Sequence, residues 1–236
     1  SRGQYDKAIK NYEEALAIAR KLGQEAEVAR SLNYIGRVYH SWGQYNEAIK
    51  HFKEALAIGK RLGREADIAR DINNIGMVYN SWGRYDKAIK HYEEALAIDK
   101  RLGREADVAI YLSNIGMVYS SWGQYDKAIK HFKEALAIAR KLGAEAVVAR
   151  GLNDIGGVYS SRGQYDKAIK HYEEALAIDK RLGRKAYEAI RLNNIGGAYY
   201  LQGKCKTAIR YLTKSVEKIE IIRKTATGDI RRDYLA

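Results

Sequence analysis

The stretch "DINNIGMVYNSWG" at residues 71–83 places two carboxamides, Asn73 and Asn74, and a glycine, Gly76, inside a run of apolar residues at helical spacing. Asparagine and glycine both lower helix stability in a helix interior. Close copies nevertheless recur at residues 31–43, 111–123, 151–163 and 191–203. A pattern that keeps two unfavourable residue types in all five copies must need them for packing or for binding.

The copies belong to a repeat with a fixed period. Trp42, Trp82 and Trp122 are 40 residues apart, and the glycines that follow them keep the same spacing. A fixed period in this range is typical of solenoid proteins, in which each unit packs only on its neighbours. The repeats are therefore expected to form one continuous array rather than separate domains.

Each repeat contains two apolar patterns with the period of an α-helix. In the second copy Ile72, Ile75 and Tyr79 follow the first pattern, and the other begins after Gly83 and ends before Gly103. Glycine adopts the left-handed backbone conformation that commonly follows a helix. Each repeat is therefore predicted to be a pair of antiparallel helices of about 18 residues, and the fold to be all-α.

One copy carries a resemblance to a known family. The positions concerned are Leu32, Ile35, Gly36, Tyr39, Gly43, Tyr45, Ala48, Phe52 and Ala55. They resemble a tetratricopeptide repeat (TPR), a family whose usual unit has about 34 residues. The longer unit and the absence of proline are similar to the kinesin-light-chain type, whose first helices likewise carry "LNNL"-type sequences. The resemblance covers residues 1–222 and implies a right-handed superhelical solenoid whose first helices line a concave groove.

The repeat boundaries predict the organisation of the whole chain. Residues 1–23 form the second helix of a truncated repeat, five repeats occupy 24–63, 64–103, 104–143, 144–183 and 184–224, and residues 225–236 start a downstream linker or helix. The stretch "KTATGD" at 224–229 is expected to break the last helix. Residues 215–236 resemble the junction that follows TPR arrays in CHAT-domain proteins, which implies a caspase-like peptidase effector beyond Ala236 and no catalytic residue of it in this chain.

Helical geometry separates the two roles of the first helix. Successive residues are about 100° apart, so Ile72, Ile75 and Gly76 share one face. That face is predicted to meet the second helix of the same repeat, which can come close because Gly76 has no side chain. Asn74 lies about 200° from Gly76 and faces away from this seam.

By the resemblance, the stripe opposite the seam lines the groove. The predicted lining residues are Arg30, Asn33, Arg37, Arg70, Asn73, Asn74, Met77, Asn114, Arg150, Asn153, Asp154, Asn193 and Asn194. A carboxamide donates and accepts hydrogen bonds and can hold the backbone of an extended peptide, and arginine favours acidic side chains or a terminal carboxylate. The alternative is that these amides bond to one another between neighbouring first helices and bind nothing.

The net charge of +13 has two interpretations. Basic residues gather where the second helices end, at Lys60, Arg61, Arg64, Lys100, Arg101, Arg104, Lys180, Arg181 and Arg184. Cations at a helix C-terminus are favoured by the helix dipole, which explains much of this basic edge. The other interpretation is an acidic protein, RNA or DNA bound along the edge, and nucleic-acid binding of this kind would be salt-sensitive and sequence-blind.

The sequence contains no catalytic constellation. No Ser/His/Asp set, phosphate loop or metal-protease motif is present, so we predict no enzymatic activity and no cofactor. One histidine per repeat is predicted to lie on a solvated outer face, too far from the next to share a metal: His51, His91, His131 and His171. Cys205 replaces the tyrosine seen at Tyr45 and is expected to be a small buried hydrophobe.

Composition bounds the functional class. The chain is 46% hydrophobic and 30% charged, as globular domains are. The single cysteine allows no internal disulfide, so a cytoplasmic location is expected. The leading hypothesis is a scaffold that binds a protein or peptide. No membrane partner is expected. The alternatives are polyanion binding and a structural spacer. Because the helix predicted for residues 1–23 lacks the first helix of its own repeat, end-to-end self-association is also expected.

Overall fold

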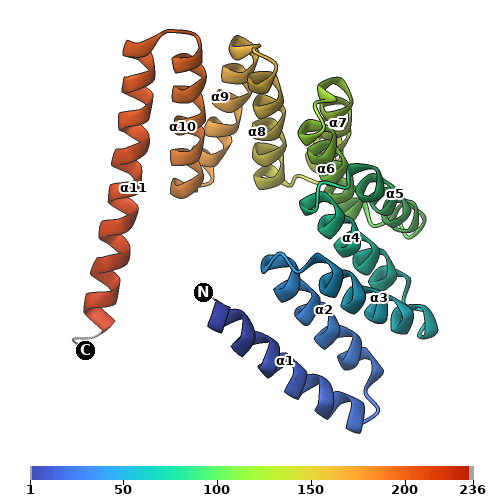
Figure 1. Ribbon diagram of the computed structural model, residues 1–236. Helices are drawn as coiled ribbons and strands as arrows, with labels where there is room; N and C mark the ends of the chain where they lie inside the picture. Colours follow the sequence, from blue (N-terminus) through green and yellow to red (C-terminus); the bar gives the residue numbers. More distant parts are fainter. Residues whose placement is uncertain (1, 234–236) are drawn as a thin grey trace. The chain divides into compact units, whose positions relative to one another are not determined.

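The computed structural model describes the backbone of residues 2–233 and the side chains of residues 3–225. Every regular element in this part of the chain is an α-helix (Figure 1). The helices are α1 (Arg2–Lys21), α2 (Glu25–Ser41), α3 (Tyr45–Arg61), α4 (Glu65–Ser81), α5 (Tyr85–Arg101), α6 (Glu105–Ser121), α7 (Tyr125–Lys141), α8 (Glu145–Ser161), α9 (Tyr165–Arg181), α10 (Lys185–Leu201) and α11 (Cys205–Asp233).

The chain divides into two compact units. Unit 1 is Ser1–Trp122 and contains α1 to α6, and unit 2 is Gly123–Ala236 and contains α7 to α11. Within each unit consecutive helices pack together, as α10 and α11 do in Figure 1. The predicted all-α fold of antiparallel helix pairs is confirmed.

Glycine ends the helices as predicted. After α4, Gly83 adopts a φ of 72°, in the left-handed region. The N–H of Arg84 donates to the carbonyl oxygen of Tyr79 at 2.8 Å, and the N–H of Gly83 donates to that of Asn80 at 2.9 Å. These two bonds satisfy carbonyls that the end of a helix leaves without partners, and they reverse the chain into α5.

The glycine in the middle of the first helix permits close packing. A Cβ atom on Gly76 would lie 2.8 Å from the ring of Tyr92 in α5. In unit 2 a Cβ atom on Gly156 would lie 2.7 Å from the ring of Tyr172. Such distances are shorter than any carbon–carbon contact a packed core tolerates, so the predicted close approach is confirmed.

The second helices α3, α5 and α9 each pack between two first helices. In unit 1, α3 packs against α2 of its own repeat and against α4 of the next repeat. Phe52 and Ile49 of α3 lie in one core cluster with Ile75 and Val78 of α4. The core is therefore a series of small clusters that link each repeat to its neighbour, as expected for a repeat protein.

The predicted break at residues 224–229 is wrong. Helix α11 continues through these residues to Asp233, and residues 234–236 lie outside the described part. The stretch contains no proline, and a glycine such as Gly228 costs a helix only about 1 kcal/mol. Turn-forming composition is therefore insufficient to end a helix without a capping arrangement like that at Gly83.

The predicted burial of Cys205 is wrong as well, because this side chain is exposed. At the equivalent position Tyr45 has its ring 5.7 Å from that of Trp82 in the next repeat. Similarly, the rings of Tyr85 and Trp122 are 6.0 Å apart. Cys205 lies on α11, the last second helix described, and no tryptophan of a following repeat lies against it in the described residues.

The histidines are half-buried rather than solvated, which corrects their predicted placement. The ring of His51 stacks on Tyr39 with centroids 5.4 Å apart, and His171 stacks on Tyr159 at the same distance. Burial lowers the pKa of His51 and of His171. Each of these histidines therefore helps to pack the first helix onto the second.

Two further classes of feature are absent from the described part of the chain. None of its helices is both long and apolar enough to span a bilayer. Nowhere in it do three or more His, Cys, Asp or Glu side chains gather as metal ligands would.

Candidate functional site

A cleft of about 440 Å³ lies between α2 and α4, the first two first helices of unit 1. It contains six of the residues predicted to line a groove, namely Arg30, Asn33, Arg37, Arg70, Asn74 and Met77. Tyr34, Arg64 and Asp67 also line it. The structure thus brings the predicted residues of the first two copies together at one concave surface.

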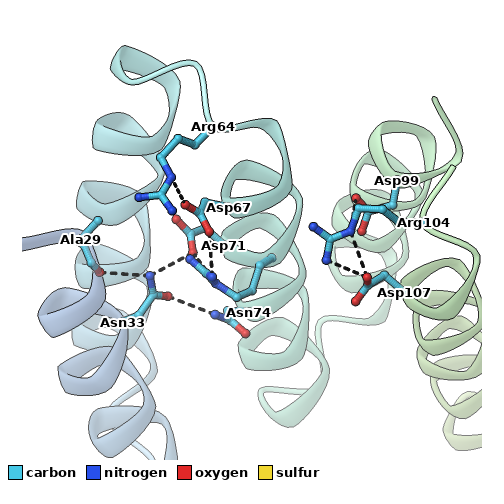
Figure 2. Close-up of polar contacts among 10 residues, drawn as sticks. Ala29, Asn33, Arg64, Asp67, Asp71, Asn74, Asp99, Arg104 and Asp107 are labelled. Atoms are coloured by element: carbon cyan, nitrogen blue, oxygen red, sulfur yellow. Dashed lines mark hydrogen bonds and ion pairs between the residues drawn. The ribbon is translucent and has the colours of Figure 1, made fainter. Parts of the chain in front are cut away.

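The amides in this cleft bond across it (Figure 2). The side-chain N–H of Asn74 donates to the carboxamide oxygen of Asn33 at 3.1 Å. Asn33 in turn donates to Asp71 at 2.9 Å and to the backbone carbonyl of Ala29 at 3.1 Å. Asn33 therefore uses both of its N–H groups and one oxygen acceptor within the protein.

The same link recurs at other first helices. Asn114 of α6 donates to Asn73 of α4 at 2.9 Å. Asn73 also lies with its amide nitrogen 3.7 Å from the sulfur of Met77. In unit 2, Asn194 of α10 donates to Asn153 of α8 at 2.8 Å. An asparagine in one repeat thus contacts an asparagine 41 residues earlier, which fixes the spacing of successive first helices.

The arginines of the cleft differ in how far they are neutralised. Arg64 and Arg70 both contact the carboxylate of Asp67, at 2.7 Å and 2.8 Å. Arg30 pairs with Glu27 at 2.8 Å. Arg37 is exposed and forms no ion pair with any described residue. Four guanidinium groups line the cleft, and the carboxyl groups of Glu27, Asp67 and Asp71 lie against three of them, so Arg37 carries the positive charge that the described residues leave unpaired.

A buried carboxyl group lies behind the amide link. Asp71 is almost fully buried, and burial raises its pKa to about 6. The hydrogen bond from Asn33 and the charge of Arg70, 3.6 Å away, act in the opposite direction. The amide pair therefore depends on a carboxyl group that is close to protonation near neutral pH.

The remaining predicted groove residues lie in unit 2. Arg150 and Asn193 are exposed on α8 and α10. Asn153 lies with its amide nitrogen 3.4 Å from Asp154, and burial raises the pKa of Asp154. Unit 2 therefore repeats the amide link, with an acidic residue at the position where unit 1 has Asn74.

Five cleft residues were not among the predicted lining residues, namely Ala26, Ala29, Tyr34, Arg64 and Asp67. Arg64 had been assigned to the basic edge, but its spacing of three residues from Asp67 brings it onto the cleft. Asp67 itself could have been found from its position midway between Arg64 and Arg70. Tyr34, whose ring stacks on Tyr12 at 5.1 Å, occupies the position in α2 that Asn74 occupies in α4.

The basic edge is largely ion-paired. Arg61 contacts Glu25 at 2.8 Å and Arg101 contacts Glu65 at 3.0 Å. In unit 2 Arg181 contacts Glu145 at 2.7 Å. Each pair joins the end of a second helix to the start of the first helix of the same repeat. This arrangement favours helix-end charge compensation over a continuous polyanion surface.

The family model described as "Tetratricopeptide repeat" matches residues 1–61, 67–141 and 147–220. None of the curated proteins matches the chain.

Several solved structures share the fold. BtubC (BKLC) from P. vanneervenii is 24% identical, with a TM-score of 0.82 over 93% of this chain and 92% of that chain. A putative kinesin light chain of Podosopora anserina with nearly identical TPR-like repeats is 18% identical, with a TM-score of 0.70 over 85% and 98%. A Rap protein complexed with Competence and Sporulation Factor is 20% identical, with a TM-score of 0.69 over 98% and 70%.

Proposed function

This chain belongs to the tetratricopeptide repeat family, and from that premise we propose that it is a non-enzymatic scaffold whose α2/α4 cleft binds an extended acidic peptide. Repeats of this family generally serve as protein-interaction scaffolds. One of the structurally similar proteins, the Rap protein, was solved with Competence and Sporulation Factor bound to it. The finer assignment to one cleft and one ligand class rests on the geometry in unit 1.

The observation that carries the proposal is the excess of positive charge in a concave site. Four arginines line the cleft of about 440 Å³, where Glu27, Asp67 and Asp71 lie against three of them and Arg37 has no ion pair within the described residues. A guanidinium group binds a carboxylate through paired hydrogen bonds that are stronger than neutral ones. An acidic side chain or a terminal carboxylate would therefore complete the charge balance of the cleft.

In this proposal the asparagine side chains do not hold the backbone of the peptide, the role predicted for them from the sequence. Asn33 and Asn74 bond to each other, so they set the distance between α2 and α4. The arginines carried on these two helices are held at a fixed separation as a result. We assign binding chiefly to the arginines, and positioning to the amide link.

A charge-matched pair of probes tests this proposal. The first is an N-acetylated octapeptide of alternating Glu and Ala, and the second replaces each Glu by Gln. Fluorescence anisotropy should show binding of the Glu peptide only, weakening as salt rises because exposed charges are screened. Equal binding of both peptides would contradict the proposal.

Arg37→Gln should weaken binding of the Glu peptide about tenfold, since one charged hydrogen-bond pair is lost. Arg37 makes no ion pair with the described residues, so its removal should leave the fold intact. The matched control is Arg101→Gln on the basic edge, which should leave affinity unchanged. If the control weakens binding and Arg37→Gln does not, the ligand lies on the edge and the cleft assignment is wrong.

Two further predictions are independent of the α2/α4 cleft. One is a C-terminal effector controlled by the array, which the resemblance of residues 215–236 implies. The other is a cytoplasmic location. Both stay predictions.

A further inference from the structure

The first half of α11 carries a charge pattern that the other second helices do not have. Lys206, Arg210 and Lys214 are four residues apart, so they lie along one side of the helix at intervals of about 6 Å. No acidic residue occurs between Glu188 and Glu217. We call these three basic residues the α11 basic stripe.

The same three positions of the other second helices alternate in charge. In α9 they are Asp166, Lys170 and Glu174, and α1, α5 and α7 likewise have Asp, Lys and Glu there. Helix α3 differs only in having Asn46 at the first position. A lysine between two carboxylates at this spacing stabilises a helix, whereas like charges at the same spacing destabilise it. Helix α11 therefore has an unfavourable pattern that an anionic partner would relieve.

The stripe lies on a side of the second helix that neighbouring helices leave open. The three equivalent residues of α9 are all exposed, although α9 packs between α8 and α10. The residues of the stripe are exposed in the same way. A further helix packed on α11 as α10 packs on α9 would therefore leave the stripe accessible.

The stripe is not neutralised within the described part of the chain. None of its residues forms an ion pair with a described residue, and the guanidinium group of Arg210 lies 5.4 Å from the ring centroid of Tyr211. One turn further on, Lys218 does pair, with the carboxylate of Glu188 at 2.5 Å. The stripe thus differs from the basic edge, whose cations are largely paired.

One groove of unit 2 repeats this change of charge. In unit 1, Arg20 of α1 lies 3.8 Å from Glu54 of α3. The corresponding residues of α9 and α11 are Lys180 and Lys214, which both line a groove of about 560 Å³. Two carboxylates line it as well, those of Glu173 and Glu217. A cation and an anion on successive second helices are thus replaced by two cations.

We propose that the α11 basic stripe binds the phosphodiester backbone of a nucleic acid without reading its sequence. This surface is separate from the α2/α4 cleft and goes beyond the function proposed above. An exposed lysine gains little free energy from a single carboxylate. A nucleic acid carries condensed counterions, and each phosphate that a lysine or arginine neutralises releases some of them. Three cations along an open helix side therefore fit a polymer of high charge density better than an acidic peptide.

A fluorescently labelled poly(U) RNA of about 20 nucleotides is the probe, because it forms no base pairs with itself. Anisotropy with the full chain at low salt should show binding. The logarithm of the association constant should fall with the logarithm of the salt concentration with a slope of about 2, since each of three phosphates on a single strand contributes about 0.7.

The variant Lys206→Asp with Lys214→Glu introduces the residue types that α9 has at these positions. It should stay folded, because these types are exposed there in α9, and it should bind the RNA at least about tenfold more weakly. The matched control is Lys90→Asp with Lys130→Glu, which lowers the net charge equally on α5 and α7. The control should change the affinity by less than about twofold, because distant exposed charges are screened.

Three results would overturn the proposal. The first is no RNA binding by a chain that circular dichroism shows to be folded. The second is equal weakening by the two double variants, which would assign binding to net charge alone. The third is equal or tighter binding of polyglutamate or of phosphatidylglycerol vesicles, which would assign the stripe to an acidic protein or a membrane. The cleft is tested separately, because the Glu octapeptide should bind the stripe variant unchanged.

Discussion

Residues 85–104 in unit 1 and 165–184 in unit 2 have the same sequence, yet their buried aspartates have different partners. Asp179 receives hydrogen bonds from Arg191 at 3.0 Å and from Arg184 at 3.1 Å. Asp99 lies 3.5 Å from Arg104, beyond good hydrogen-bonding distance, and faces Tyr111 where unit 2 has Arg191. Identical helices therefore acquire different electrostatics from one residue of the following helix.

The two buried carboxyl groups differ in the groups that face them. Burial raises the pKa of Asp99, and the neighbouring Tyr111 hydroxyl and Arg104 guanidinium only partly oppose it. In unit 2 the buried Arg191 supplies a full positive charge within hydrogen-bonding distance of Asp179. A buried carboxylate is tolerated when it is paired and unfavourable when it is not.

The largest difference between the two units is expected when the same substitution is made at Asp99 and at Asp179. Asp179→Asn should destabilise unit 2 by about 3–5 kcal/mol, because the buried Arg191 loses its counter-charge. Asp99→Asn should leave unit 1 unchanged or stabilise it by about 1 kcal/mol, since it removes an under-compensated charge. Hydrogen exchange of α5 and α9, read separately by mass spectrometry, measures both effects. Equal losses at the two sites would show that the partner residue is irrelevant.

A second comparison uses two neighbouring glycines in unit 2. A Cβ atom on Gly196 would lie 2.8 Å from Leu212, whereas one on Gly197 would meet nothing within 4 Å. Gly196→Ala should therefore cost about 1–3 kcal/mol through overpacking. Gly197→Ala should gain about 0.5–1 kcal/mol from helix propensity. Urea unfolding of the two variants compares them directly, and stabilisation by Gly196→Ala would mean that α10 and α11 can separate freely.

A third prediction concerns pH and unit 1. The pKa of Asp71 is about 6 in the folded protein, above the roughly 4 of an unfolded aspartate. The folded state therefore binds this proton more readily, so the contribution of Asp71 to stability rises as pH falls from 7 to 5, by on the order of 1 kcal/mol. Asp71→Asn should remove this rise. Hydrogen exchange of α4 at the two pH values, corrected for the intrinsic rate, tests it, and an unaltered rise in the variant would assign it to another group.

The smallest expected effect concerns an exposed ion pair that is present in both units. Arg101 pairs with Glu65 in unit 1, and Arg181 pairs with Glu145 in unit 2. Both pairs are exposed, and exposed ion pairs contribute up to about 1 kcal/mol. Arg101→Gln and Arg181→Gln should each shift the urea midpoint slightly and by the same amount. A large difference between them would mean that the surroundings matter even at the surface.

Packing was more predictable than polar pairing. The close approach at Gly76 and the left-handed turn at Gly83 follow from steric rules that depend only on local sequence. The burial of Asp99 does not, because a carboxylate is ordinarily placed on the surface and its burial depends on Tyr111 in the next helix. The exposure of Cys205 likewise depends on which residues surround α11.

The candidate site shows the same division. Six of the predicted residues line one cleft, because helical periodicity puts them on one stripe of the first helix. The direct bond between Asn33 and Asn74 stayed one of two alternatives, since a carboxamide can donate to a peptide or to another carboxamide equally well. Only the distance between α2 and α4 distinguishes the two.

The amino-acid sequence alone determined the period of the repeat, the helix pairs, their ends and the face that packs, because these depend on contacts within about 20 residues and on the geometry of one helix. The tertiary structure alone decided which buried carboxyl groups are paired with a cation and which amides are already bonded to one another. Those properties depend on side chains from two repeats meeting across a few ångströms, and the sequence of either repeat by itself contains no such distance.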